Sequence, residues 1–159
     1  MNGVRIVLRA LHRAEQHLVD QLTTVSECHR AEHEVHHVAT DLAAWSDEHA
    51  RRLADAAADR GLDLTGPPEP ADGGVAAPPR EAWGGSPEPG LVLLDDLRHL
   101  HLAATDTSLS WVVLAQAAQA RRDAGLLALT AACHPQTLRQ IRWTTTLIKT
   151  LSPQILTSL

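Results

Sequence analysis

The sequence predicts an all-α protein, a single domain in which four long helices pack as a bundle. The chain has 159 residues, which is the size of one domain. Its apolar residues are mainly alanine, leucine and valine, while phenylalanine and tyrosine are absent and tryptophan occurs four times. Alanine and leucine favour helices, whereas strands are usually richer in aromatic and β-branched residues. Apolar residues also recur at alternating steps of three and four in four long segments, which is the spacing of a bundle helix.

The first two helices are predicted over residues 3–28 and 31–60. The buried seam of the first is Leu8, Leu11, Glu15, Leu18, Leu22 and Val25. The seam of the second is Val35, Val38, Leu42, Trp45, His49, Leu53 and Ala56. Gly61 follows, a residue common just beyond the end of a helix. Residues 62–90 contain seven prolines with glycines between them, which predicts a long linker without regular structure.

The third and fourth helices are predicted over residues 91–122 and from Asp123 to just before Pro153. The third seam is Leu93, Leu97, Leu100, Ala104, Thr107, Trp111, Leu114 and Ala118. Asp123 is expected to cap the fourth helix, because a short acidic side chain accepts hydrogen bonds from the first free backbone amides. The fourth seam is Leu127, Ala131, His134, Leu138, Ile141, Thr145 and Ile148. Pro135 lies inside this segment and is expected to kink or split the helix.

Two long helices, a long linker and two more long helices resemble the ferritin-like superfamily. In that family the second and third helices are joined by a crossover that runs the length of the bundle. The resemblance covers nearly the whole chain, 1–159, and implies the same crossover here. The family's metal motif combines a glutamate on helices one and three with Glu-x-x-His on helices two and four. In this chain the residues three before His49 and His134 are Ser46 and Ala131, and only Glu34 and His37 have the literal spacing.

Three ionisable residues, Glu15, His49 and His134, occupy positions in the predicted seams. Glu15 lies 15 residues before Arg30 in the first turn and His49 lies 19 residues after it, so their heights in the bundle are similar. His134 lies 11 residues beyond Asp123. A lengthwise crossover brings His134 to the level of the other two, whereas an up-down-up-down path separates it from them by roughly 6 to 12 Å.

Two interpretations of these three residues remain open. Two imidazoles and one carboxylate that converge form a site for Fe(II), Mn(II) or Zn(II), which bind mixed nitrogen and oxygen ligands. Alternatively, Glu15 hydrogen bonds one or both histidines, or one of the three side chains turns to the edge of the bundle. A satisfied polar network of that kind fixes helix register without performing chemistry.

A second group of histidines flanks the first turn. His29, His33 and His37 follow one another at intervals of four, and Glu32 and His36 form another pair at the same spacing. Pairs at this spacing can chelate zinc, nickel or copper on a helix surface. Because solvent exposure is expected at the turn, these residues are interpreted as adventitious ligands.

Charge and cysteine content restrict the partners and the compartment. The formal charge of −5 and the pI near 6.0 argue against binding to nucleic acid or to an anionic membrane. Cys28 and Cys133 are isolated thiols, which favours a reducing cytoplasm. Arg5 and Arg9 interrupt the first apolar stretch, so no signal peptide is expected, and no apolar run is long enough for a membrane-spanning helix.

The C-terminal segment predicts self-association. Apolar residues extend beyond the seam of the fourth helix at Trp143, Leu147, Leu151, Ile155, Leu156 and Leu159. One face of a bundle helix cannot bury all of them, and a two-fold homodimer is the simplest arrangement that covers the remainder.

The function predicted first is a non-enzymatic helical bundle that acts as a structural or protein-interaction module. No nucleophile and base arrangement, phosphate-binding glycine loop or nucleotide motif is present in the sequence. The alternative is a metal-binding or redox-active ferritin-like protein that uses Glu15, His49 and His134. Haem bound between two histidines is a third possibility, although the sequence has no C-x-x-C-H attachment motif.

Overall fold

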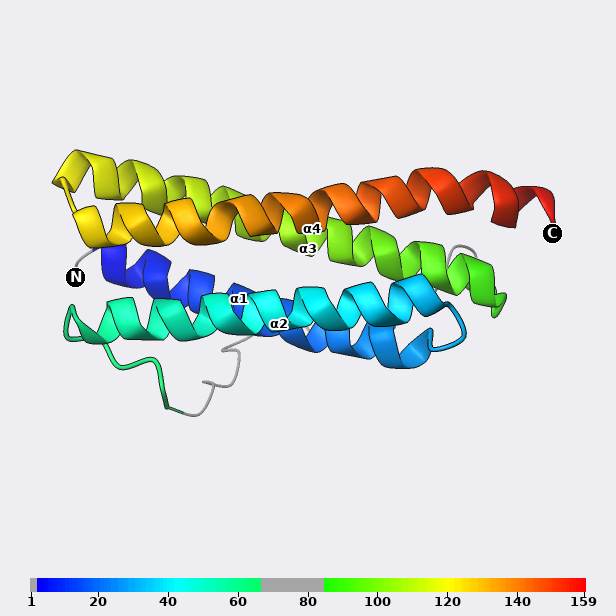
Figure 1. The fold of residues 1–159 in the computed structure, drawn as a ribbon, viewed down its shortest axis with the longest axis horizontal. Coiled ribbons are helices and arrows are strands. Elements are labelled where there is room, and N and C mark those ends of the chain that lie inside the picture. Colours follow the sequence, from blue (N-terminus) through cyan, green and yellow to red (C-terminus); the bar gives the residue numbers. More distant parts are fainter. Residues whose placement is uncertain (1–2, 67–84) are drawn as a thin grey trace.

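The computed structural model describes residues 3–66 and 85–159, which form four long helices and no strand (Figure 1). Helix α1 spans Gly3–Cys28, α2 spans His33–Ala58, α3 spans Pro89–Arg121 and α4 spans Ala124–Thr157. The all-α prediction and the first three helices are confirmed, with ends that differ by no more than two residues. Residues 67–84 of the predicted linker lie outside the described residues. No described helix combines the length and the apolar character needed to cross a membrane.

The connection between α2 and α3 returns along the length of the bundle. Helices α1 and α2 are antiparallel, as are α3 and α4, but α2 and α3 run in the same direction (Figure 1). The core clusters agree, because the start of α3 and the start of α2 belong to the same cluster, which contains Leu97 and Val35. The end of α3 and the end of α2 belong to the other cluster, which contains Leu114 and Leu53. The predicted crossover is therefore confirmed.

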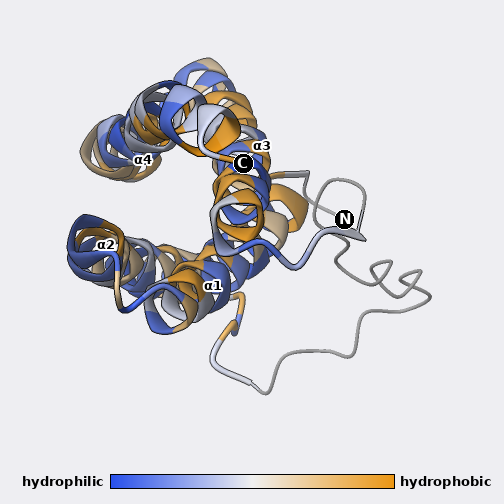
Figure 2. Cartoon of the chain, turned by 90° about the vertical axis from the view of Figure 1, so that its right-hand side faces the viewer, coloured by the Kyte–Doolittle hydropathy of each residue, from blue (hydrophilic) through white to orange (hydrophobic). Residues whose placement is uncertain are grey.

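Seen along the bundle, the helices lie in the order α2, α1, α3, α4 (Figure 2). Helix α1 contacts α2 and α3, and α4 contacts α3 and, less extensively, α2. Helices α1 and α4 are therefore diagonal partners. A side chain of α1 that points along this diagonal meets the centre of the bundle, within reach of both of its neighbours.

The apolar core is divided into two clusters, one at each end of the bundle. One contains Leu8 and Leu11 of α1 with Leu114 of α3, and the other contains Leu22 of α1 with Leu100 of α3. Buried polar residues separate the clusters, and Glu15 lies between Leu11 and Leu18 in the buried face of α1. The fold therefore has a polar layer across its middle.

The predicted seam of α4 is wrong by one residue. The residues of α4 that are buried in the bundle are Leu126, Leu129, Thr130, Cys133, Thr137, Gln140, Thr144 and Leu147. One residue corresponds to a rotation of about 100° around the helix. The error has a physical cause: half of the inward residues of α4 are threonine or glutamine, while the leucines and isoleucines used for the prediction flank them. The apolar residues that recur with helical spacing in α4 therefore lie at the edge of its buried face.

Helix α4 continues through both of its prolines, so the predicted split at Pro135 and the predicted end before Pro153 are wrong. Each proline removes one backbone donor, but contacts with α3 hold the helix on both sides of it. His134 Nε2 lies 2.8 Å from Ser108 Oγ, and Thr144 Oγ1 lies 3.0 Å from His101 Nδ1. Beyond Pro153, Ile155 packs so closely on Gly90 that a Cβ at Gly90 would lie 2.7 Å from Ile155 Cγ2.

Asp123 caps α4 as predicted and also joins it to the end of α2. Its Oδ1 accepts a hydrogen bond from the Leu126 amide at 3.1 Å, and Arg60 Nη2 donates to Oδ1 at 2.7 Å and to Oδ2 at 2.8 Å. The hydrogen-bonded guanidinium of Arg60 holds the pKa of Asp123 below its ordinary value. The Arg60–Asp123 pair therefore holds the start of α4 beside the end of α2.

We predict that Asp123→Ala lowers the free energy of unfolding by about 0.5–2 kcal/mol at pH 7, because it removes the helix cap. Asp123→Asn keeps the cap and loses the charge, so it is the matched control. Since the pKa of Asp123 is lower in the folded protein, the stabilisation by its charge is present above about pH 3.9 and is lost as the pH falls through the folded value. Urea unfolding of the three proteins, followed by circular dichroism, measures these free energies. If wild type and Asp123→Asn still differ in free energy of unfolding in strong acid, the prediction is contradicted.

Candidate functional site

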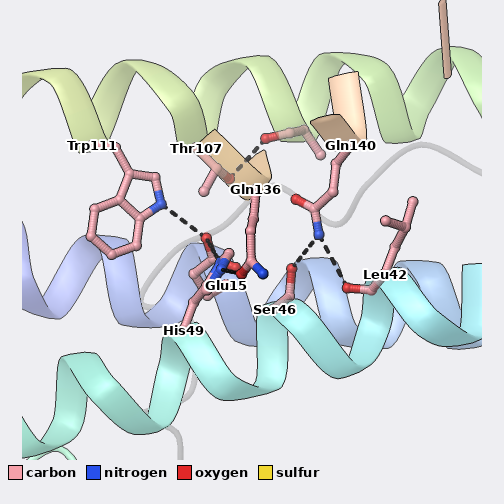
Figure 3. A network of polar contacts seen from close by, with 9 residues as sticks. Glu15, Leu42, Ser46, His49, Thr107, Trp111, Gln136 and Gln140 are labelled. Carbon is pink, nitrogen blue, oxygen red and sulfur yellow. Dashed lines mark hydrogen bonds and ion pairs between the residues drawn. The ribbon is translucent and has the colours of Figure 1, made fainter. Parts of the chain in front are cut away.

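The candidate site is the polar layer between the two core clusters, to which all four helices contribute (Figure 3). Glu15 comes from α1, Ser46 and His49 from α2, Trp111 from α3, and Gln136 and Gln140 from α4. Glu15 lies between Trp111 and His49, and the two glutamine side chains point toward α2 (Figure 3). Glu15 and His49 are buried, with exposed fractions of 0% and 1%, whereas Gln136 is half-buried.

Glu15 is held by groups from two neighbouring helices. Its Oε1 accepts a hydrogen bond from Trp111 Nε1 at 3.0 Å and lies 3.3 Å from His49 Nδ1. Its Oε2 is buried and has no hydrogen-bond partner. A buried carboxylate without partners is strongly unfavourable. These contacts therefore fix α1 against both α2 and α3 at this level.

His49 links the carboxylate to α4. Its Nε2 lies 2.7 Å from Gln136 Oε1, and its ring meets the Trp111 ring edge-on, with centroids 6.0 Å apart and an interplanar angle of 83°. Both ring nitrogens of His49 thus face side-chain oxygen atoms, one on α1 and one on α4. A chain of contacts therefore runs from Trp111 through Glu15 and His49 to Gln136.

A second bridge between α4 and α2 lies one helical turn away. Gln140 Nε2 donates to the Leu42 carbonyl at 3.1 Å and to Ser46 Oγ at 2.9 Å (Figure 3). Gln140 Oε1 and the hydroxyl of Thr137 are buried without a hydrogen-bond partner. Together with Glu15 Oε2, they are buried polar atoms of the layer that form no hydrogen bond with a described residue.

The structure brings together two of the three residues predicted as a metal site. Glu15 and His49 are in contact, whereas His134 is half-buried and its Nε2 lies 2.8 Å from Ser108 Oγ. Burial lowers the pKa of His134. The cause of its position is the register of α4, which turns His134 toward α3 and places Gln136 against His49. Within residues 3–66 and 85–159, no three histidine, cysteine, aspartate or glutamate side chains are grouped as a metal site.

Sequence reasoning missed the two glutamines and the polar role of Trp111. Trp111 was expected only as an apolar residue of the third seam, and its indole nitrogen is also a donor to Glu15. Gln136 and Gln140 lay outside the predicted seam. The signal that identifies Gln140 is the row Thr137, Gln140 and Thr144, which has helical spacing but no apolar member.

The histidines at the first turn are divided among three environments. His29 lies in the turn after α1, and its Nε2 is 2.8 Å from Asp96 Oδ2 of α3. His36 turns inward, with Nδ1 2.8 Å from the Ser26 carbonyl. His33 and His37 remain exposed on α2. The predicted row of three is therefore reduced to the pair His33 and His37.

The two cysteines and a charged surface groove are further reactive or charged features that bear on a site. Cys28 is exposed and Cys133 is buried, and both are free thiols. Burial raises the pKa of Cys133 to about 11, so its thiol is protonated at neutral pH. The charge of Glu15 adds to the rise in the pKa of Cys133, but burial is the larger cause. A surface groove of about 620 Å³ beside the Arg60–Asp123 pair is lined by neither Glu15 nor His49.

Comparison with protein families, with curated proteins and with solved structures finds no match to this chain. The class of protein is therefore defined by its own architecture: an all-α bundle of four helices with a lengthwise connection between α2 and α3 and a buried polar layer.

We predict that Glu15 and His49 stabilise the bundle as a unit. Glu15→Leu or His49→Leu alone leaves a buried polar partner unsatisfied, and we expect a loss of about 3–5 kcal/mol for each. The double variant removes both polar groups, so we expect its loss to be smaller than the sum by about 0.5–3 kcal/mol. Urea unfolding of the four proteins gives this coupling energy, and additive losses would show that the two residues act separately.

Proposed function

We propose that this chain is a non-enzymatic helical module that acts through protein contacts and associates with a second copy of itself. The observation that carries the proposal is a set of exposed apolar side chains on α3 and α4, here named the outer apolar face. Its members are Leu102, Leu109, Val112, Val113 and Leu138, which are between 41% and 61% exposed.

The five side chains are neighbours because of helix periodicity and the pairing of α3 with α4. Leu102, Leu109 and Val113 lie seven and four residues apart, so they share one side of α3. Leu138 lies one turn after His134 on the same side of α4. Since His134 contacts Ser108, this side of α4 lies next to α3. An exposed apolar face of this kind commonly marks a protein contact.

A second copy is the partner that fits the charge of this face. Between residues 99 and 120 of α3, Asp106 is the only aspartate, glutamate, lysine or arginine. Such a face offers no charge pattern to select a foreign partner, but it is complementary to itself. If two α3 helices pair antiparallel about Leu109, the two copies of Asp106 are separated by about 9 Å along the axis and do not clash. Helix α3 has apolar residues both on its core side and on the opposite side, as expected of a helix that packs on two sides in its assembly.

The C-terminal surface expected from the sequence to form the contact is partly covered within the monomer. Trp143, Ile148 and Leu151 pack against the second core cluster. Leu156 and Leu159 are still 56% and 64% exposed. They can extend the contact, but the outer apolar face is the broader surface.

The buried polar layer supports a structural function. Glu15 and His49 are 0% and 1% exposed, and their contacts link all four helices. Polar contacts in a bundle core specify helix register, which keeps a binding surface in one arrangement. The proposal also includes kinship with ferritin-like bundles, supported by the crossover, and a cytoplasmic location, supported by the two free thiols.

We expect wild-type protein to have the mass of two 17.2-kDa chains in size-exclusion chromatography with light scattering. Leu109→Lys places a charge at the centre of the outer apolar face, and we expect a monomer, because central apolar residues of interfaces contribute about 2 kcal/mol or more. Ile6→Lys changes a similarly exposed residue of α1 and is the matched control. Leu156→Lys tests the C-terminal surface separately. A wild-type protein that is monomeric at all concentrations contradicts the proposal.

A second candidate function is metal binding or redox chemistry inside the bundle. It is supported by one observation, the unpartnered Oε2 of Glu15 beside His49. Iron, manganese and zinc suit this mixture of ligand atoms. For this function we expect stoichiometric metal in protein purified without a His-tag and its loss in Glu15→Gln. Metal analysis that finds none, in protein with native circular dichroism, removes this candidate.

A further inference from the structure

His33 and His37 are two exposed histidines on consecutive turns at the start of α2. Their rings are stacked, with centroids 6.1 Å apart and an interplanar angle of 14°. The spacing of four residues places both imidazoles on one side of the helix. Their side chains therefore already lie next to each other, without a rearrangement of the backbone.

The ring nitrogens of this pair are not engaged within the described part of the chain. Six other histidines have a ring nitrogen in a hydrogen bond: His29, His36, His49, His99, His101 and His134. By contrast, His33 and His37 make only ring contacts, with each other and between His37 and His36. Two adjacent imidazoles with available nitrogen atoms form a chelating pair.

The charges around the pair favour a cation. Asp41 continues the same side of α2 one turn beyond His37, and Glu34 lies in the first turn of the helix; both are exposed. The positive end of the helix dipole lies at His33 and disfavours a cation there. The negative charges of Glu34 and Asp41 offset this effect. Because His36 is turned toward Ser26, the pair has no third histidine ligand, and the remaining coordination positions face solvent.

We propose that His33 and His37 form a two-histidine site for a divalent transition-metal ion on the solvent face of α2. Imidazole nitrogen suits Cu²⁺, Ni²⁺ and Zn²⁺, and the general order of affinities places Cu²⁺ first. Water fills the open positions, so the bound ion can accept a further ligand from solution. Protonation of the imidazoles competes with the metal, and binding weakens in acid. The site does not depend on the proposed self-association, because it lies on a different helix from the outer apolar face.

Isothermal titration of protein purified without a His-tag, with Zn²⁺ and separately with Ni²⁺ as the ligand, tests the site. We expect one ion per chain. His33→Ala and His37→Ala should each weaken binding by about 100-fold, because a single imidazole replaces a chelate. His17→Ala removes an exposed histidine of α1 and is the matched control, with unchanged binding expected. Both variant positions are exposed, so circular dichroism should remain native.

The outcomes separate this site from the interior of the bundle. Binding that is retained in Glu15→Gln and lost in His33→Ala supports the proposal. Binding that is retained in both His33→Ala and His37→Ala overturns the proposal. It is also overturned if neither Zn²⁺ nor Ni²⁺ gives a heat of binding. Broadening of backbone resonances by Cu²⁺ gives an independent measurement. We expect it to be confined to the start of α2 and its surroundings, and broadening centred elsewhere overturns the assignment.

Discussion

The buried carboxylate of Glu15 is the constraint on which the middle of this bundle depends. A carboxylate that is 0% exposed needs donors, and they come from other helices: Trp111 of α3 and His49 of α2, with His49 in turn facing Gln136 of α4. The apolar clusters on either side tolerate small shifts of one helix along another, since apolar contacts have little direction. The polar contacts do not, because hydrogen bonds weaken steeply with distance and angle. The layer therefore sets the register of all four helices.

The crossover and the polar layer require each other. Since α2 and α3 run in the same direction, the end of α3 lies beside the start of α1, and Trp111 is at the height of Glu15. The same arrangement places the start of α4 beside the end of α2, where Arg60 and Asp123 are paired. With an up-down-up-down path, the order of residues along α3 and α4 would be reversed relative to α1, and these pairs would be separated.

The surfaces left after folding are the basis of the proposed contacts with other molecules. Glu15 and His49 are buried in the interior, while α3 exposes Leu102, Leu109 and Val113 on the side opposite its core residues. A helix with apolar residues on both sides gains stability by burying the second side as well. The exposed histidines of α2 add a polar surface of a different chemistry on another part of the bundle, so the two surfaces can act independently.

The sequence by itself determined the helical class, the extent of α1, the seam of α3 and the contact between Glu15 and His49. In those helices the buried residues are large and apolar or stand alone as polar exceptions, so periodicity identifies them. Only the tertiary structure decided the rotation of α4, the partner of His134 and the roles of Gln136 and Gln140. The physical reason is that half of the inward face of α4 is threonine and glutamine, and the long-range partners of this helix, such as Leu42 and Ser46 for Gln140, lie on other helices. Such partners are distant in sequence, and no periodic pattern within one helix reveals them.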